Sequence, residues 1–313
     1  MTIASIDVGT NTVLLLIAEL DLKNLTLTTL LNEQRIPRIG EGLEPGKPIK
    51  EAKQKLLIEI LESYKSISKS YNSEQVLVNA TNAFRIAANQ NELIEKIKQS
   101  TELSVNVISG LEEARLTFLG STYEYSNNKE FAVIDIGGGS TEIIIGKKNN
   151  ISEIFSLPFG AVNLTERFFS SPPPNAIQIQ TCIRFIENEL YKLSLRFKQY
   201  DIAIAVAGTP TTLACIQSGL TEYDEFKIEG KVLKLNEVEN FSLELSRYTP
   251  LEIKEKYRAV VAGREDVLLA GTILLFQIMK YLNAEEVVVS SKGLRYGAVV
   301  DYLLRNIRDL NFE

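Results

Sequence analysis

Two loops in the sequence carry residue types that bind phosphate and metal ions. They span residues 6–12 (Ile-Asp-Val-Gly-Thr-Asn-Thr) and 134–141 (Ile-Asp-Ile-Gly-Gly-Gly-Ser-Thr). Glycines let the backbone approach a phosphate closely, and successive N–H groups of such a turn form a concave anion site. Asp135, at a strand end, can hold a divalent cation, usually through water. Such a loop by itself is more often a structural hairpin. The pair predicts phosphate contacts from Gly9, Thr10, Asn11, Gly137, Gly138, Gly139, Ser140 and Thr141.

The two loops follow one pattern. In each, an apolar strand ends on an aspartate, passes through a glycine-containing turn with hydroxyl side chains, and enters a second apolar strand, and the copies lie 128 residues apart. A long-period similarity with only two copies predicts duplicated domains rather than a repeat array. The alternative, two unrelated hairpins that share Asp-x-Gly, leaves the matching flanking strands unexplained.

A third loop and two arginines extend the set. Residues 207–212 (Ala-Gly-Thr-Pro-Thr-Thr) follow an apolar strand and precede a helix, where N–H groups of Gly208 and Thr209 can bind an anion. A plain turn capped by Thr209 explains this loop equally well. Arg85 and Arg264 could position phosphates or form surface ion pairs. The chain has no G-x-x-x-x-G-K-[ST] motif, which excludes a P-loop enzyme.

Two adjacent glutamates in residues 109–115 have different expected duties. Ser109 followed three residues later by Glu112 is the pattern of a capping box, which gives Glu112 a structural role. Glu113 lies about 100° further around the helix and has no part in the capping box. Its carboxylate could therefore polarise a water molecule. The competing interpretation is a solvated residue favoured by the helix dipole.

The composition narrows the chemistry. The chain of 313 residues contains no histidine and two cysteines, which excludes Ser-His-Asp triads, phosphohistidine intermediates and nearly all zinc sites. Acid–base chemistry then falls to carboxylates, and a metal would be a hard cation with oxygen ligands. Because the net charge is −6, phosphate must be bound by local groups, and no basic face for nucleic acid is expected.

Strands and helices alternate along the chain, which predicts an α/β protein with partly parallel sheets. Long helices are expected at about 50–69, 175–198, 264–282 and 293–306. No apolar run is long enough to span a bilayer, and no signal peptide is expected because the N-terminus lacks a basic region. We therefore expect a cytoplasmic protein whose cysteines, Cys182 and Cys215, are reduced core residues.

In this order, the motifs resemble the exopolyphosphatase/guanosine pentaphosphate phosphohydrolase (Ppx/GppA) family in its short two-domain form. The resemblance covers nearly the whole chain and includes the loops above together with residues 38–43, 80–85, 108–115, 159–162 and 290–295. It implies two ribonuclease-H-like domains of the acetate-and-sugar-kinase/heat-shock/actin superfamily, with the site in an interdomain cleft. The last helix would return to the first domain, which gives residues 1–126 with 298–313 as one domain and residues 127–297 as the other.

The resemblance also implies roles for single residues. Glu113 matches the family's proposed general base. Asp135 and Glu142, helped by Asp7, match the acids proposed to organise the metal. Many relatives carry Arg or His where this chain has Leu14, the counterpart of Glu142 in the internal repeat. The departure leaves the choice of substrate open.

These observations predict an exopolyphosphatase that uses Mg²⁺ or Mn²⁺ to hydrolyse the terminal phosphate of inorganic polyphosphate. The alternative substrate is guanosine pentaphosphate (pppGpp). Two further interpretations are a sugar or acetate kinase and an actin-like nucleotide-binding assembly protein. We expect polyphosphate or a guanosine penta- or tetraphosphate as ligand, no nucleic acid or membrane as partner, and a monomer or homodimer.

Overall fold

The computed structural model describes all residues except 23, 25, 149, 194–198 and 311–313, and the chain divides into two compact units. Unit 1 comprises Met1–Tyr123 with Lys292–Glu313, and unit 2 comprises Glu124–Ser291. The boundaries expected at 126/127 and 297/298 lie a few residues further along the chain. The second expected boundary cuts the last helix, whereas the observed boundary precedes that helix.

Unit 1 is built on a five-stranded sheet of order β3-β2-β1-β4-β5. Strands β1 (Thr2–Val8), β2 (Val13–Asp21) and β3 (Thr26–Arg35) form an antiparallel meander. Strands β4 (Gln75–Ala80) and β5 (Val105–Val107) continue the sheet on the other side of β1 in parallel. The carboxyl ends of β1, β4 and β5 therefore meet at one edge, where ligands of α/β sheets usually bind.

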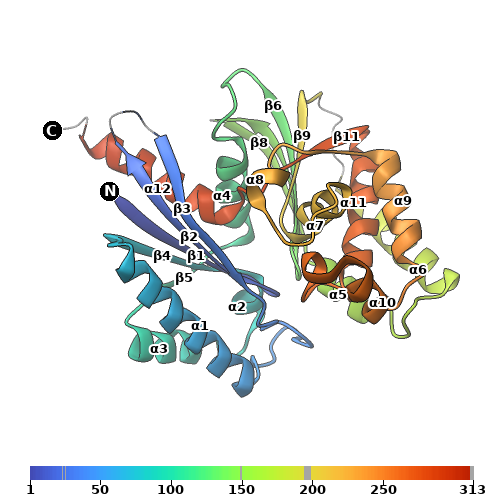
Figure 1. The fold of residues 1–313 in the computed structure, drawn as a ribbon, viewed down its shortest axis with the longest axis horizontal. Helices are drawn as coiled ribbons and strands as arrows, with labels where there is room; N and C mark the ends of the chain where they lie inside the picture. The colour runs from blue at the N-terminus through green and yellow to red at the C-terminus, as the bar shows by residue number, and fades with distance from the viewer. Residues whose placement is uncertain (23, 25, 149, 194–198, 311–313) are drawn as a thin grey trace. The chain divides into compact units, whose positions relative to one another are not determined.

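Helices cover both faces of this sheet (Figure 1). Helices α1 (Glu51–Ser70) and α3 (Gln90–Thr101) pack on one face through an apolar core, and α4 (Gly110–Thr122) and α12 (Leu294–Leu310) lie on the other. The short helix α2 (Asn82–Ile86) follows β4 directly. Helix α12 thus returns the end of the chain to unit 1, as expected.

Two glycines let α12 and α4 touch backbone to backbone. A Cβ on Gly297 would lie 1.8 Å from the carbonyl oxygen of Leu116, and a Cβ on Gly120 would lie 2.4 Å from that of Gly293. Real Cβ atoms do not approach so closely, so any larger residue would separate the two helices. The contact fixes α4, which carries Glu113, against the end of the chain.

Unit 2 is built on a six-stranded sheet of order β10-β11-β9-β6-β7-β8. Strands β6, β7 and β8 form an antiparallel meander. Strand β9 pairs with β6 in parallel, and β11 pairs with β9 in parallel. Strand β10 pairs with β11 in antiparallel fashion at the edge. The sheet therefore repeats the order of unit 1 with one strand added. The strands are β6 (Glu130–Ile136), β7 (Thr141–Lys147), β8 (Asn150–Leu157), β9 (Ile202–Val206), β10 (Val232–Lys234) and β11 (Glu286–Val289).

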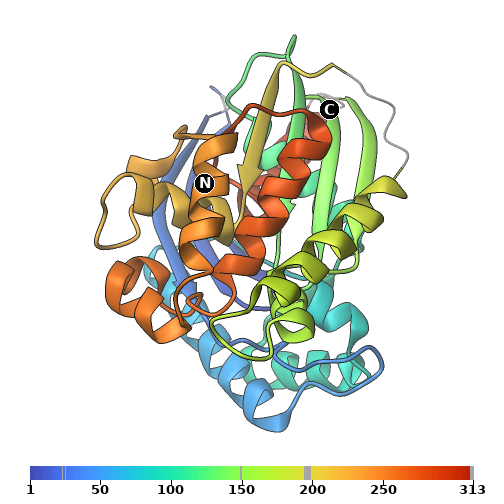
Figure 2. The same cartoon turned by 90° about the vertical axis from the view of Figure 1, so that its right-hand side faces the viewer.

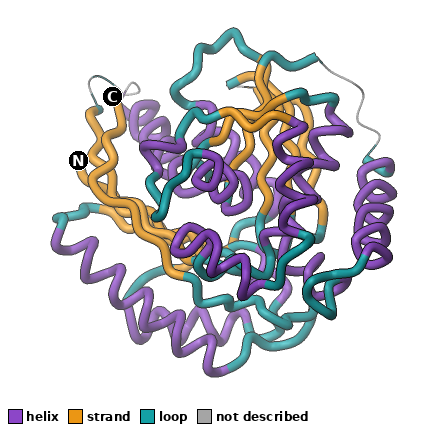
Figure 3. The backbone as a smooth tube through the Cα atoms, turned by 45° about the vertical axis from the view of Figure 1, so that its right-hand side comes forward, coloured by secondary structure: helices purple, strands orange, loops and turns teal. Residues whose placement is uncertain are grey.

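Helices also flank the sheet of unit 2, and Figure 2 shows α9, α11 and α6 side by side over one of its faces. In each unit the strands form one band with helices beside it (Figure 3). The expected helix 264–282 begins four residues late, at Leu268, and the end of the expected helix 175–198 falls partly outside the described residues. The helices of unit 2 are α5 (Ala161–Phe168), α6 (Ala176–Tyr191), α7 (Gly208–Gln217), α8 (Glu225–Ile228), α9 (Leu235–Leu245), α10 (Pro250–Tyr257) and α11 (Leu268–Leu282).

The strand registers confirm the internal repeat. Asp7 pairs with Leu14 across β1 and β2, and Asp135 pairs with Glu142 across β6 and β7. Each pair occupies the same place in its hairpin, and the 128-residue offset holds for both strands. The predicted α/β fold of two ribonuclease-H-like units is therefore confirmed.

The cysteines and the helix lengths agree with further expectations. Cys182 and Cys215 are buried and carry free thiols, and burial raises the pKa of the Cys182 thiol to about 12. Among the described residues, no helix is both long and apolar enough to cross a membrane.

Candidate active site

The first hairpin loop is held by the neighbouring segment 38–43. Within the loop, the Gly9 N–H donates to the carbonyl of Thr12 over 2.9 Å. The carbonyls of Thr10 and Asn11 accept from the N–H groups of Gly40 (2.9 Å) and Arg38 (3.0 Å). A Cβ on Gly40 would lie 2.3 Å from the Thr10 side chain, so glycine is needed for this contact. Two sequence motifs, separate in the chain, therefore form one structure.

The second hairpin loop has the same construction. The Gly137 N–H donates to the carbonyl of Ser140 over 3.0 Å, which repeats the turn of the first loop. The carbonyls of Gly137 and Gly138 accept from Ala161 (3.0 Å) and Val162 (2.9 Å), the first two residues of α5. The first N–H groups of α5, which would otherwise attract an anion, thus bind the hairpin instead.

In both loops, two carbonyl oxygens at the tip accept hydrogen bonds from a neighbouring segment. Within the described part of the chain, no hydrogen bond uses the N–H groups of Thr10, Asn11, Gly138 or Gly139. Adjacent amide groups left in this way bind anions, because their dipoles point the same way. The loops in both units therefore share one hydrogen-bonding pattern, and their phosphate contacts stay a prediction.

One residue assigned to the second loop has a different role. The Thr141 side chain was expected to donate to phosphate, but Thr141 is fully buried and its hydroxyl donates to the carbonyl of Phe159 over 2.9 Å. The side chain therefore anchors the segment before α5 and is unavailable to a ligand. Ser140 and the glycines remain the candidate contacts of this loop.

The third loop combines a helix start with an arginine. The Arg264 guanidinium packs on Gly208, where a Cβ would lie 2.7 Å from Nε, and its Nη1 lies 3.4 Å from Oγ1 of Thr212. Gly208 and Arg264 therefore form one cationic surface at the start of α7, which suits an anion. Thr209 is not the N-cap that the alternative interpretation expected, and anion binding by its N–H group stays a prediction. Helix α7 is capped by Ala207, and the Thr209 side chain is buried against Gly271.

Ala207 adopts a backbone conformation that only glycine adopts without strain. Its φ is 72° and its ψ −166°, a region in which a Cβ costs about 1–3 kcal/mol. We expect Ala207→Gly to stabilise the protein by about 1 kcal/mol after the entropy cost of glycine is subtracted, measured by urea denaturation. The matched control is Ala205→Gly in the preceding strand β9, where φ is not positive, and it should destabilise the protein. Equal effects of both changes would contradict the strain.

The candidate general base, Glu113, lies against a candidate phosphate ligand. Glu113 Oε2 is 2.6 Å from Arg85 Nη1, which also donates to the carbonyl of Ile108 over 3.1 Å. The side chains are 12% and 22% exposed, so water reaches the pair from one side. This ion pair holds the Glu113 carboxylate in one orientation. Arg85 thus acts on Glu113, a role that the sequence did not indicate.

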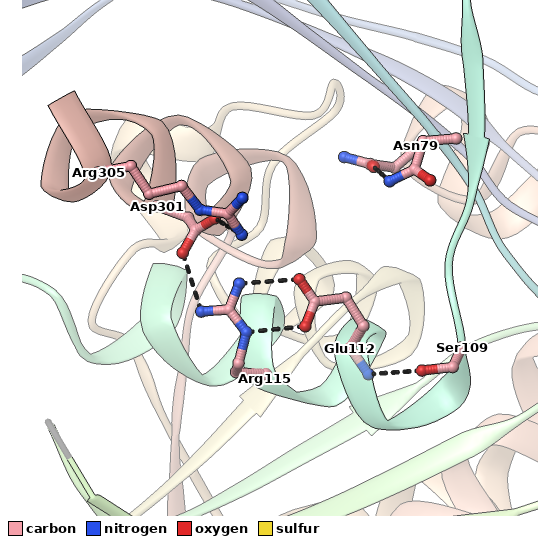
Figure 4. A network of polar contacts seen from close by, with 7 residues as sticks. Asn79, Ser109, Glu112, Arg115, Asp301 and Arg305 are labelled. Carbon is pink, nitrogen blue, oxygen red and sulfur yellow. Dashed lines mark hydrogen bonds and ion pairs between the residues drawn. The ribbon is translucent and has the colours of Figure 1, made fainter. Parts of the chain in front are cut away.

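The neighbouring Glu112 is fixed to α12 instead (Figure 4). Its carboxylate accepts from Arg115 Nε and Nη2, both over 2.8 Å, and Arg115 Nη1 donates to Asp301 over 2.9 Å. Asp301 also pairs with Arg305 over 2.7 Å. The hydrogen bond to Glu112, followed by that to Asp301, raises the pKa of Arg115.

The predicted capping box is therefore only half formed. Ser109 Oγ accepts from the Glu112 N–H over 3.2 Å, as expected. The Glu112 carboxylate, however, forms a bidentate ion pair with Arg115. Two charge-assisted hydrogen bonds are stronger than one hydrogen bond from a backbone N–H. Glu112 keeps a structural role, with a different partner.

Two of the candidate metal ligands, Asp7 and Asp135, lie at equivalent places in the two units, and the third, Glu142, lies beside Asp135. Asp135 and Glu142 are register partners on β6 and β7, so their side chains share one face of the sheet. Glu142 is 1% exposed and accepts from Ser156 Oγ over 2.9 Å, a contact that orients its carboxylate and that the sequence did not reveal. No cluster of three or more possible ligands from Asp, Glu, Cys and His occurs among the described residues. Two carboxylates suit Mg²⁺, which completes its shell with water and substrate phosphates.

A protein-family model and two curated relatives match most of the chain. A model of the Ppx/GppA phosphatase family matches residues 16–306. Exopolyphosphatase 2 of Mycobacterium tuberculosis is 31% identical over 297 residues, which cover 90% of this chain and 91% of that protein. A bifunctional 3-dehydroquinate synthase/phosphatase of Fusobacterium nucleatum is 32% identical over 310 residues, 95% of this chain and 46% of that protein. This chain thus spans less than half the length of the second relative.

Solved structures give the same result. The crystal structure of the Aquifex aeolicus member of the Ppx/GppA family matches with a TM-score of 0.84 at 33% identity, covering 98% of each chain. An exopolyphosphatase from Cytophaga hutchinsonii matches with a TM-score of 0.88 at 27% identity, covering 97% of this chain and 98% of the other.

Proposed function

Because the chain belongs to the Ppx/GppA phosphatase family, we propose that it is an exopolyphosphatase that removes the terminal phosphate of inorganic polyphosphate. The observation that carries the proposal is the shared construction of the two hairpin loops. In each, the carbonyls are bound by protein and adjacent amides are left to bind anions. Two such loops suit a ligand that offers many equivalent phosphate oxygens.

The proposed reaction is attack by water on the terminal phosphorus. Glu113 takes a proton from the water as its oxygen bonds to phosphorus, and the bond from phosphorus to the bridging oxygen breaks. Arg85 keeps the Glu113 carboxylate in one orientation. The loop amides and Arg264 bind the phosphate oxygens and stabilise the charge that builds on them.

We also propose that Asp135 and Glu142, with Asp7 as third candidate, hold Mg²⁺ or Mn²⁺. The bound ion would neutralise phosphate charge and so lower the barrier to attack by an anionic or polarised water. Ser156 keeps the Glu142 carboxylate oriented for this role.

Metal removal should abolish activity. We expect phosphate release to stop in excess EDTA and to return with Mg²⁺ or Mn²⁺, because oxygen ligands select hard cations. A zinc-selective chelator serves as the control and should have no effect, since the chain has no histidine. Full activity in EDTA would refute the metal proposal.

Phosphate release from long-chain polyphosphate, pppGpp and ATP, measured side by side, tests the function. We propose that polyphosphate has the highest kcat/KM. With Leu14 in place of a charged residue, the first hairpin lacks a contact that a short nucleotide would need, whereas a long chain spreads the loss over many phosphates. A preference for pppGpp would support the alternative activity, and release from none of the three would overturn both.

A further inference from the structure

The polar residues beside the two equivalent aspartates, Asp7 and Asp135, lie on different neighbouring strands in the two units. In unit 2, Asp135 lies between Glu142 on β7 and Val206 on β9. In unit 1, Asp7 lies between Leu14 on β2 and Asn79 on β4. Each aspartate thus has one polar and one apolar neighbour, on opposite sides in the two units.

The fold itself does not require an amide at position 79. Its counterpart, Val206, occupies the same place in unit 2 and is fully buried. Asn79 is only 7% exposed, and an amide buried to that extent costs free energy unless its polar atoms have partners. A role outside packing therefore explains the residue better.

A neighbouring amide fixes the orientation of Asn79, which is labelled in Figure 4. Asn106, the register partner of Asn79 on β5, donates from Nδ2 to Asn79 Oδ1 over 3.3 Å. Within the described part of the chain, the Asn79 side chain makes no other hydrogen bond. Because its oxygen is engaged, Asn79 presents its NH₂ group as a donor at the strand ends where Asp7 lies.

We infer that Asn79 is a substrate-binding residue whose NH₂ group donates to a phosphate oxygen beside Asp7, and that Asn106 positions it. The inference rests on the proposed function. Leu14, beside Asp7 on β2, cannot make a polar contact with the substrate. Asn79, on the other side of Asp7 on β4, would make one through its NH₂ group. Asn79 would thereby contribute to the choice of a phosphate chain as substrate.

Kinetics on long-chain polyphosphate with three variants test the inference. Asn79→Val, which copies Val206, should lower kcat/KM about 10- to 100-fold, mainly through KM, as expected for loss of a hydrogen bond to a charged group. Asn79→Asp should lower it further, because a carboxylate repels phosphate. Asn106→Ala should lower kcat/KM less, by about 3- to 10-fold, because the Asn79 amide group can then rotate and exchange its oxygen and NH₂ positions.

The control is Gln75→Val, an amide-to-valine change at the other end of β4, where the side chain is exposed; it should leave kcat/KM within about twofold of wild type. Thermal unfolding separates binding from structure: we expect Asn79→Val to keep the wild-type Tm. A lower Tm with unchanged kcat/KM would overturn the inference and leave the proposed function intact. A wild-type protein that neither binds nor hydrolyses polyphosphate would overturn both.

Discussion

Glu113→Gln should lower kcat on polyphosphate by about 10²–10⁴-fold, the usual effect of removing a general base. KM should stay nearly the same, because the glutamine carbonyl can still accept from Arg85, which lies 2.6 Å from the carboxylate. With less negative charge beside Arg85, binding of the polyanion should not weaken. Steady-state kinetics together with calorimetric binding of polyphosphate check both parts.

Glu112→Gln is the matched control, since it makes the same chemical change one residue away. It weakens the bidentate ion pair with Arg115, which is partly exposed. The change should lower the free energy of unfolding by roughly 1 kcal/mol and leave kcat near the wild-type value. If the two variants lose kcat equally, Glu113 has no special role. If Glu113→Gln leaves kcat unchanged, the proposed mechanism is wrong.

The sequence was sufficient to predict the parts of the site that repeat. The Asp-x-Gly loops, their 128-residue spacing and the paired positions of Leu14 and Glu142 all follow from local pattern and internal comparison. The structure bears them out because each loop joins two consecutive antiparallel strands, an arrangement that a local sequence pattern can indicate. The loop segments 38–43 and 159–162, found by resemblance, acquire a physical explanation only as the partners of the loop carbonyls.

Contacts between distant segments could not be predicted in the same way. The pairing of Arg85 with Glu113 depends on β4 and β5 being neighbours, and no local pattern encodes that. The Thr141 hydroxyl was expected to bind phosphate. Its actual partner, the Phe159 carbonyl, lies 18 residues further along the chain and cannot be identified from local sequence. The sequence does not indicate strand β3 (Thr26–Arg35), because it is a half-exposed edge strand whose polar residues weaken the apolar alternation.

The second large effect is expected from one methyl group, at Gly160. A Cβ there would lie 2.2 Å from the carbonyl oxygen of Gly137 and 2.8 Å from the carbonyl carbon of Gly138. Both atoms are backbone, so Gly160→Ala must push α5 away from the loop and break the bonds that Ala161 and Val162 donate to it.

Once freed, the loop carbonyls of Gly137 and Gly138 can turn toward the anion that the amides should bind, and a carbonyl repels phosphate. We therefore expect Gly160→Ala to lower kcat/KM on polyphosphate by at least about 10²-fold, comparable to the loss of an oxyanion donor. Gly146→Ala is the control: its Cβ would meet the Asn150 carbonyl oxygen at 2.7 Å, a similar clash at the far end of the same hairpin. Both variants should lose stability, but only Gly160→Ala should lose activity at temperatures where both are folded. Equal activity losses would mean that the hairpin as a whole, rather than the orientation of its loop, determines phosphate binding.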